Sequence, residues 1–526
     1  MKKYKINKLI LLSLFTFLPL FCISQSIDRE KVYELGKKAR KGKLAYVEQV
    51  ENKDYKLYYI TKASSKKAKV DVYRFDKDFN FKEITQEEIL FEKMKLKFDW
   101  FNFNGELYTV EGTTVSYNPA FPLKLKKKRI TYKYDWLFLG YYKTVEILEK
   151  VKPRTDDGMK YYCFKYMEDE ITGDLYIVAG AAPGGLDKNA GNRLTDIRLL
   201  KFDKDLNKVA ETKVTFEFGQ EVAFAQPFAE ADPENPEALG IVGGALVFAP
   251  NEWKGSSAPK DKNKGNFTYV EFDKDLKLVA RESFTSPSPG WSMDGASWIA
   301  KSDGTKDVYI YGAAALGKDK YHMYAVQSAK KKSIQVLKVN SGKIDYLTET
   351  SLEEIENAKK LPASNKKTVS YTGKQKLVFQ FAEINSGNII LYSQYYSKEG
   401  IPQDYTALEY DQSGKLVANY MRNMELQPKV KMGINHTISE NKNGVFWTTF
   451  EVDETKSVAS IAPVISKIDV KMKTFGEPLL LGKVGKKPTY FVDQSFPMLN
   501  ISNTQQVYFG SDKSGKNIWF CRVNLD

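Results

Sequence analysis

The sequence is poor in the residues that most often perform chemistry in proteins. Its 526 residues include only two histidines, His322 and His436, and three cysteines. Zinc sites built from several histidines and Ser-His-Asp catalysis both need residues that this chain can barely supply. The cysteine count also excludes a disulfide-rich scaffold. We therefore predict no metal site, no cofactor and no histidine-based catalysis.

Long apolar runs are also scarce, and the clearest one lies near the N-terminus. Residues 9–23 are largely apolar, follow four lysines and precede Ser24 and Gln25, which is the layout of a secretory signal peptide. A membrane-spanning helix needs roughly 20 apolar residues, more than this run offers. We predict cleavage after Ser24 and a periplasmic or secreted mature chain without a transmembrane segment. An uncleaved anchor is the alternative.

Cys22 is a poor candidate for lipid attachment, because Leu20 and Phe21 are bulky where lipoprotein signals carry small residues. Removal of the signal leaves Cys163 and Cys521, which an oxidising compartment would allow to pair. They lie in predicted strands of repeats that are far apart in order, and a disulfide needs Cα atoms within about 7 Å. We predict two buried free thiols, with pairing as the alternative.

The formal net charge is +14, and it falls to about +10 when the four signal lysines are removed. Much of it lies in runs at residues 126–129 and 330–332, a pattern typical of solvated loops and turns. A nucleic-acid reader would concentrate arginine and aromatic residues on one face, and exported proteins rarely meet nucleic acid. We predict no nucleic-acid partner, whereas attraction to an acidic partner such as an anionic glycan stays open.

A short sequence motif recurs along the chain. Phe-Asp-Lys-Asp stands at residues 75–78, 202–205 and 272–275, each time at the end of an alternating apolar run, and weaker copies occur at 339–342, 410–414, 468–469 and 523–524. The residue that opens each copy is called the anchor here. With a further anchor at residue 117, most anchor spacings cluster near 60 to 70 residues, with two outliers. Recurrence at such a period indicates a repeat architecture.

Each repeat fits four short strands. The pattern is clearest at residues 375–383, 388–396, 405–410 and 415–421, where turns rich in Asn, Gly and Ser separate the runs. The same interpretation fits residues 160–217 and 434–482. We therefore predict an all-β fold, a single seven- or eight-bladed β-propeller of four-stranded antiparallel blades, in which no long edge is left open. A β-solenoid and two stacked sandwiches are the alternatives.

Two segments carry a family resemblance. Residues 496–520 include Ser511-Asp512-Lys513-Ser514-Gly515 between two apolar runs, and residues 296–311 include Ser302-Asp303-Gly304. Both resemble the blade motif of TolB-like propellers, although the second lacks the proline of that family. The resemblance covers about two blades well. It implies a propeller fold, and such propellers mostly serve as binding platforms.

The chain ends directly after the predicted third strand of its last blade, so a fourth strand must come from elsewhere. We divide the chain into a signal peptide at residues 1–24, an N-terminal segment at 25–42 and the propeller at 43–526. The N-terminal segment is the natural donor of a closing strand. The charge spacing of residues 28–41 equally suits a short capping helix.

A candidate binding face follows from the order of strands. In a four-stranded meander, the connections from second to third strand and from blade to blade emerge at one end of the sheet. The long connections at residues 182–195, 250–266, 285–295 and 351–367 are all of these two kinds. Loops on a rigid scaffold often carry function, so we predict that this face binds a ligand.

Four residues are predicted to bind a ligand: Trp291, Asp294, Trp298 and His436. Trp291 offers an exposed aromatic ring beside the Asp294 carboxylate, which suits stacking of a sugar or a side chain, although a Trp wedged between blades is an equally good interpretation. Trp298 lies in the TolB-like segment. His436 is expected near a first strand, where a structural role is favoured.

We predict a non-catalytic exported scaffold that binds an envelope protein or a glycan, as a monomer or as part of an envelope complex. The alternative is a carbohydrate-active propeller enzyme that uses carboxylates in the central channel.

Overall fold

The computed structural model describes the chain from residue 25 to residue 526. It leaves out residues 51–52, 64–66, 91–106, 116–120, 136–139, 183–194, 218, 234–237, 251–266, 316–329, 365–367, 386, 427, 430, 432, 434, 456–457, 486 and 494–497. The described residues form two compact units. The larger unit comprises residues 36–361 and 365–435, and the smaller one residues 25–35, 362–364 and 436–526. The predicted signal peptide and anchor 117 lie outside the described residues.

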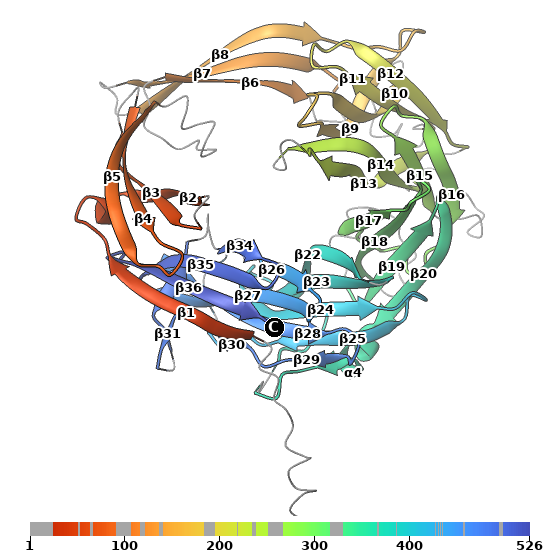
Figure 1. Ribbon diagram of the computed structural model, residues 1–526. Coiled ribbons are helices and arrows are strands. Elements are labelled where there is room, and N and C mark those ends of the chain that lie inside the picture. Colours follow the sequence, from red (N-terminus) through yellow and green to blue (C-terminus); the bar gives the residue numbers. More distant parts are fainter. Residues whose placement is uncertain are drawn as a thin grey trace, which may run out of the picture. The chain divides into compact units, whose positions relative to one another are not determined.

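The larger unit is a series of antiparallel sheets (Figure 1). The first two sheets are β2 (Lys43–Gln49), β3 (Tyr55–Ala63), β4 (Lys67–Phe75) and β5 (Phe81–Leu90), then β6 (Leu107–Val115), β7 (Leu125–Asp135) and β8 (Gly140–Val151). The next two are β9 (Lys160–Glu168), β10 (Leu175–Ala182), β11 (Asp196–Phe202) and β12 (Lys208–Thr215), then β13 (Gln220–Ala231), β14 (Leu239–Pro250), β15 (Phe267–Asp273) and β16 (Leu278–Phe284).

Two further sheets complete this unit. They are β17 (Gly295–Ala300), β18 (Lys306–Ala314), β19 (Ser333–Asn340) and β20 (Lys343–Ser351), then β22 (Lys376–Asn385), β23 (Asn388–Tyr396), β24 (Pro402–Tyr410) and β25 (Leu416–Arg422), beside which β21 (Lys359–Lys360) pairs in parallel. Its helices are η1 (Ala39–Lys41) and α4 (Leu352–Asn357). Ser351 and Glu354 form a capping box at the start of α4.

The smaller unit contains two sheets and a short hairpin. One sheet contains β26 (Thr437–Asn441), β27 (Gly444–Thr455), β28 (Val458–Asp469), β29 (Thr474–Phe475) and β30 (Leu479–Leu480). The other contains β1 (Gln25–Glu34), β33 (Tyr490–Val492), β34 (Met498–Ser502), β35 (Gln505–Asp512) and β36 (Asn517–Leu525). The hairpin is β31 (Lys483–Val484) with β32 (Lys487–Pro488).

The predicted fold class is confirmed. The chain is all-β, and its repeated four-stranded antiparallel sheets are consistent with a seven- or eight-bladed propeller. The predicted strands at residues 388–396 and 405–410 correspond to β23 and β24. No helix in the described part of the chain is long and apolar enough to cross a membrane. Cys163 and Cys521 are free and buried, as predicted.

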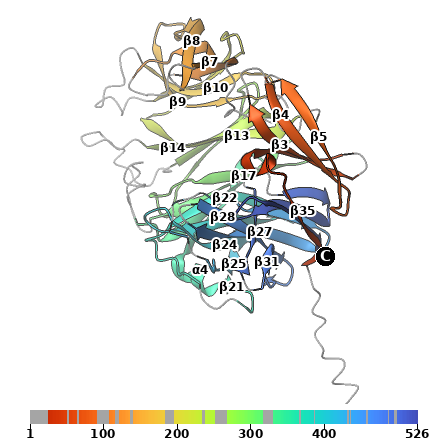
Figure 2. The ribbon, with the colours of Figure 1, turned by 90° about the vertical axis from the view of Figure 1, so that its left-hand side faces the viewer.

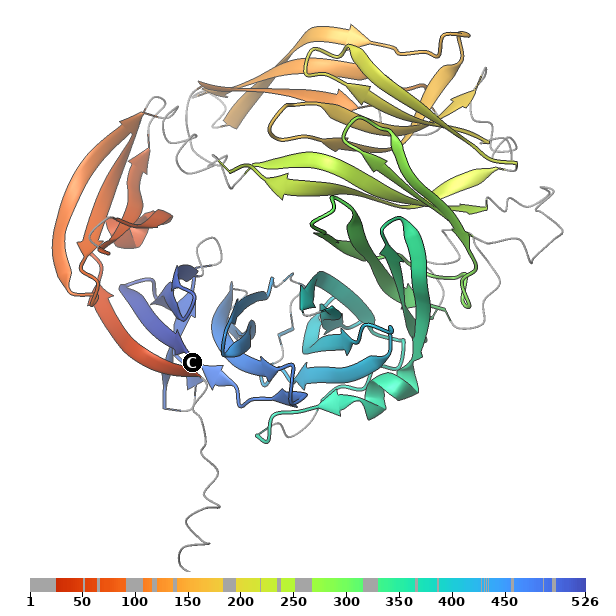
Figure 3. The ribbon, with the colours of Figure 1, turned by 45° about the vertical axis from the view of Figure 1, so that its right-hand side comes forward.

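Burial follows the position of a strand within its sheet. The second strands β10, β18 and β23 are buried along most of their length, whereas the fourth strands β12 and β16 are mostly exposed or half-buried and contain one buried residue each. Central strands are covered by neighbouring sheets on both faces, which explains their continuous apolar runs. In the larger unit the sheets of β13–β16 and β17–β20, in light to dark green, follow one another (Figure 3), and one cluster of buried side chains joins β14 and β15 to β18 and β19.

The anchors mark the ends of third strands. Those at residues 75, 202, 272, 339, 410, 468 and 523 are all buried and close β4, β11, β15, β19, β24, β28 and β36. The Asp that follows turns the chain: the Asp203 carboxylate accepts hydrogen bonds from the backbone N–H groups of Asp205 and Asn207, at 2.9 and 2.8 Å. The Asp76, Asp273 and Asp411 carboxylates accept the equivalent bonds.

The same turns hold a buried apolar residue in the left-handed region. Phe79, Leu206 and Leu276 have φ of 61°, 64° and 63° and are almost completely buried. This conformation costs a non-glycine residue roughly 1–2 kcal/mol. Gly414 occupies the equivalent position at φ 82° and avoids that cost. Burial of the apolar side chain therefore offsets backbone strain in three of the turns.

This offset predicts an unusual order of stability. Leu276→Ala loses the buried side chain and keeps the strained φ, whereas Leu276→Gly loses the side chain and relieves the strain. We expect the glycine variant to be more stable than the alanine variant by about 0.5–1 kcal/mol in urea unfolding. At Leu246, buried within β14, the order should be the usual one, with alanine better. Alanine ahead of glycine at both positions would contradict this explanation.

The N-terminal strand completes the last sheet, as the closing-strand interpretation predicts. β1 pairs antiparallel with β36 from Gln25↔Leu525 to Glu34↔Asn517, and both strands lie in the smaller unit (Figure 1). In the turned view, the dark red strand near the start of the chain lies beside the C-terminus (Figure 2). Trp519 Nε1 donates to Glu30 at 2.6 Å, and Arg522 forms an ion pair with Asp28. The helical interpretation of residues 28–41 is wrong except at η1, because the open edge of β36 satisfies the backbone of β1 as a strand.

Removal of β1 should therefore expose the edge of β36. We expect deletion of residues 25–34 from the mature chain to lower the melting temperature and to produce aggregates on size-exclusion chromatography. A synthetic peptide of residues 25–34 should restore the monomer peak, and a scrambled peptide should not. A deletion variant that melts like the intact chain would show that β1 contributes little.

Candidate functional site

The larger unit contains a cavity of about 780 Å³ at one end of two neighbouring sheets. Its lining comes from the segment before β17, the end of β18, the segment before β19, the start of β22 and the turn after β23. The lining residues are Ser292, Asp294, Ala313, Lys330, Lys331, Tyr371, Gly373, Lys374, Gln375, Lys376, Leu377, Val378 and Lys398. This volume falls within the range of small-molecule sites. It is called the lysine pocket below.

The pocket lies where the order of strands predicts a binding face. Apart from strand ends, its lining comes from connections between second and third strands and from connections between sheets. The turns at residues 301–305, 341–342 and 411–415 belong to the opposite ends of the same sheets. The long connections named in the sequence are all of the predicted kinds. The sequence prediction overlooked the connection from β18 to β19, which supplies Lys330 and Lys331.

Asp294 is fixed by the end of β18. Its backbone N–H donates to Tyr311 O at 2.9 Å, while Ala313 N and Ser292 Oγ donate to its Oδ2 at 3.0 and 3.2 Å. Gly312 makes this approach feasible, because a Cβ there would lie 1.8 Å from Ser292 O. Oδ1 of Asp294 accepts no hydrogen bond from the described residues and lies in a side chain that solvent reaches.

Asp294 and Lys331 tune each other. Desolvation in the pocket raises the pKa of Asp294 to about 6. The hydrogen bonds to its carboxylate and the positive charge of Lys331 oppose this increase. Burial lowers the pKa of Lys331 to about 8, and the charge of Asp294 opposes that shift. Lys331 Nζ also donates to Gly290 O at 3.3 Å. Both side chains are predominantly charged at neutral pH.

Tyr371 adds a buried hydroxyl to the lining. The residue is 3% exposed, and its ring stacks on Tyr395 with centroids 5.3 Å apart. Its hydroxyl forms no hydrogen bond with any described residue, and burial raises its pKa. An unsatisfied buried hydroxyl costs roughly 1–3 kcal/mol. A ligand or a water molecule that reached this oxygen would recover that free energy.

The charge of the lining is strongly one-sided. Exposed lysines form much of the rim, namely Lys330, Lys374, Lys376 and Lys398, and Lys331 is half-buried below them. Asp294 is the single carboxylate among the described lining residues. Leu377, Val378 and Ala313 add an apolar wall. The pocket therefore suits an anionic ligand that also has an apolar surface.

The four residues that we predicted to bind a ligand do not lie together in the structure. Asp294 lies in the lysine pocket. Trp291 is not the exposed aromatic that we predicted: it is 4% exposed and packs edge-on against Phe267, because its segment folds back onto the end of β18. His436 is 2% exposed and accepts a hydrogen bond from Trp447 Nε1 at 2.7 Å. Neither side chain offers a surface to a ligand.

Trp298 lines a second, smaller cavity of about 390 Å³. The walls of this cavity come from β13, β17 and β22, the first strands of three successive sheets. The Trp298 ring packs against Phe228 at 5.3 Å, and Lys306 Nζ lies 5.9 Å from its centroid. Glu383 is the single carboxylate among the lining residues. Protein groups therefore already occupy much of the Trp298 ring surface.

Sequence reasoning missed most of the lysine pocket. The run at 330–332 was expected to be solvated, but Lys331 is half-buried and lines the pocket with Lys330. The run at 126–129 lies in β7 rather than in a loop. Nothing in the local pattern singled out Tyr371.

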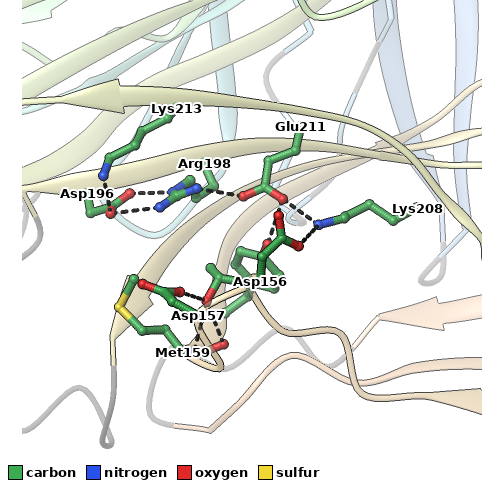
Figure 4. A network of polar contacts seen from close by, with 10 residues as sticks. Asp156, Asp157, Met159, Asp196, Arg198, Lys208, Glu211 and Lys213 are labelled. Atoms are coloured by element: carbon green, nitrogen blue, oxygen red, sulfur yellow. Dashed lines mark hydrogen bonds and ion pairs between the residues drawn. The ribbon is translucent and has the colours of Figure 1, made fainter.

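A second charged cluster lies on the sheet of β9–β12 (Figure 4). Arg198 binds Asp196 and Glu211, while Lys213 contacts Asp196 and Lys208 contacts Glu211. Tyr161 donates to Glu211 at 2.8 Å. Because each charge already faces an opposite one within the sheet, this cluster is suited to stabilising the sheet rather than to binding a ligand.

Comparisons with known proteins identify no family. No family model and no curated protein matches the chain. Among solved structures, the chain is similar to the WD40 domain of SCAP from fission yeast, at 7% identity over 94% of this chain and 98% of that one, with a TM-score of 0.28. It is similar to a PL25 ulvan lyase, a polysaccharide lyase, at 8% identity over 80% and 88%, with a TM-score of 0.26.

A lignostilbene dioxygenase from Pseudomonas brassicacearum matches at 10% identity over 87% of this chain and 89% of that one, with a TM-score of 0.26. Similarity this low carries no argument about function. The TolB-like turns also differ in position: residues 302–304 join first and second strands, whereas 511–515 join second and third strands. They are therefore not two copies of one blade motif.

The coupling of Asp294 and Lys331 predicts selective chemistry at one lysine. Because its pKa is about 8, Lys331 should be acetylated at pH 7.5 at least about tenfold faster than the rim residue Lys398, as measured by peptide mass spectrometry. Asp294→Asn removes the charge that favours the protonated amine, so Lys331 should react faster still. Equal labelling of Lys331 and Lys398 would contradict the proposed environment.

Proposed function

We propose that this chain is an exported, non-catalytic binding protein whose loop-rich face captures an anionic glycan of the cell envelope in the lysine pocket. The observation that carries the proposal is the lining itself, in which five lysines surround a single carboxylate and an unsatisfied hydroxyl. The signal-like N-terminus supports export to the periplasm or beyond.

The physical basis is electrostatic attraction followed by short-range contact. Exposed rim lysines raise the local concentration of an anion and accelerate encounter, an effect that salt screens over about 10 Å at 0.1 M ionic strength. Half-buried Lys331 lies where solvent screening is weaker. Binding should therefore weaken as salt is added but retain a residual, salt-resistant part.

A carbohydrate-active enzyme is the alternative, and the cavities favour it less. Glycosidases commonly use two carboxylates on either side of the scissile bond, about 5–9.5 Å apart. The lysine pocket and the Trp298 cavity each contain one carboxylate among their described lining residues, Asp294 and Glu383. A single carboxylate beside lysines suits recognition better than hydrolysis.

The proposal predicts which end of the sheets binds polyanions. Replacing Lys330, Lys374, Lys376 and Lys398 by glutamine should weaken binding to an acidic polysaccharide by roughly tenfold or more at low salt. The matched control replaces Lys204, Lys274, Lys343 and Lys415, exposed lysines at the opposite ends of the sheets. Affinity can be measured by isothermal titration calorimetry.

The control variant should bind within about twofold of the unmodified chain, because it carries the same net charge but an intact pocket. Equal losses in both variants would assign binding to net charge alone and would overturn the proposal. The same mixtures should contain no shortened polysaccharide after prolonged incubation. Product formation would support the enzyme alternative instead.

A further inference from the structure

We infer that the lysine pocket recognises a uronate-type sugar, in which one carboxylate is flanked by free ring hydroxyls, in preference to a sulfated sugar. This inference rests on the proposed function and names the ligand class of the same site. It depends on three residues that line one cavity and differ in chemistry: Asp294 with a carboxylate, Tyr371 with a hydroxyl and Lys331 with an amine.

The carboxylate is the informative group. A pocket that bound only negative charge would gain nothing from Asp294, which repels anions. Asp294 nevertheless lies in the lining as an exposed residue, held by Ser292 and Ala313 through Oδ2, and no described residue donates a hydrogen bond to its Oδ1. An ionised carboxylate is an acceptor only, so its natural partners are donors such as sugar hydroxyls. A sulfate ester at those hydroxyls would remove the donor and add repulsion.

Tyr371 supplies the second polar contact. Its buried hydroxyl has no hydrogen-bond partner among the described residues and can both donate and accept. The stacked Tyr395 ring fixes its position. Leu377, which lines the same pocket, offers an apolar surface for the C–H face of a sugar ring. The apolar wall can therefore cover one face of a sugar ring, and a sugar hydroxyl that reached the Tyr371 oxygen would satisfy it.

Lys331 supplies the counter-charge. It is the half-buried lysine of the pocket, and its Nζ is oriented by Gly290 O. A single interior cation matches the single charge of a uronate carboxylate, while the four exposed rim lysines can face the carboxylates of neighbouring units. The cavity volume of about 780 Å³ leaves room for a short oligosaccharide rather than one unit alone.

Acidification should remove the discrimination. The groups that face Asp294 are Ser292 from its own segment, Lys331 from the segment before β19, Tyr311 from β18 and Tyr371 from the segment before β22. Between pH 7 and pH 5 Lys331, with a pKa of about 8, stays predominantly protonated, and Tyr311 and Tyr371, whose pKa values are raised by burial, stay neutral. Since the pKa of Asp294 is about 6, its charge is lost over that interval.

The test uses three trisaccharides of equal length: trigalacturonate, sulfated maltotriose and unmodified maltotriose. Binding to the mature chain is measured by calorimetry at pH 7.0 and pH 5.0 in low salt. We expect trigalacturonate to bind at least about tenfold more tightly than sulfated maltotriose at pH 7.0. At pH 5.0, where galacturonate stays ionised, the ratio should fall to about threefold or less.

Two variants separate the contributions. In D294N the ratio of the affinities for trigalacturonate and sulfated maltotriose should be about threefold or less at both pH values. Loss of the Asp294 charge should strengthen binding of the sulfated probe, and loss of the carboxylate acceptor should weaken binding of trigalacturonate. Y371F should weaken trigalacturonate binding about fivefold and leave the pH dependence unchanged. Circular dichroism and melting curves should match those of the unmodified chain, and binding of the sulfated probe provides an internal check of folding for D294N.

The outcomes distinguish the inference from the proposed function. If the sulfated probe binds as tightly as trigalacturonate at pH 7.0, or if D294N leaves the ratio unchanged, the inference is wrong and the proposed anion binding stands. If neither charged probe binds more tightly than unmodified maltotriose, the inference and the proposed function both fall.

Discussion

The alternation of antiparallel strands is the constraint on which the rest of this structure depends. In a four-stranded meander, connections must emerge alternately at the two ends of the sheet, so second-to-third and sheet-to-sheet connections share one end. The opposite end is occupied by short turns, many of which are stabilised by an aspartate side chain. The long connections named from the sequence all belong to the first of these ends, and the lysine pocket is built there.

In the lysine pocket, a rigid scaffold places two groups of opposite charge, Asp294 and Lys331, in one lining. Asp294 is held by the backbone of β18, and Lys331 by a carbonyl of the segment before β17. Desolvation shifts the pKa of each group toward neutrality and the charge of the other group opposes that shift, so both groups are predominantly charged at pH 7. The Tyr371 hydroxyl, which has no hydrogen-bond partner among the described residues, adds a further polar group to the lining.

Much of the fold could be predicted from the sequence because the recurring turn has a physical cause. The aspartate side chain, the buried anchor and the left-handed residue after them define a strand end, and the described anchors all fall at ends of third strands. Closure by the N-terminal segment also followed, because an open strand edge needs a partner. The choice between strand and helix for residues 28–41 could not be made from charge spacing alone.

The site was less predictable, for reasons of distance along the chain. Asp294, Lys331 and Tyr371 come from three different connections, and no local pattern indicates that they converge. Trp291 looked exposed because Pro, Gly and Ser surround it, yet its segment packs against β18 and buries the ring. Composition predicts where loops occur but not which loop residues face inward.

Hydrogen–deuterium exchange in the presence of trigalacturonate tests the central claim most directly. We expect trigalacturonate to slow amide exchange in residues 290–295, 330–332 and 371–378. Exchange should not change in the turns at 203–207 and 411–415, at the opposite ends of the sheets. Slower exchange confined to those short turns would contradict the assignment of ligand binding to the lysine pocket.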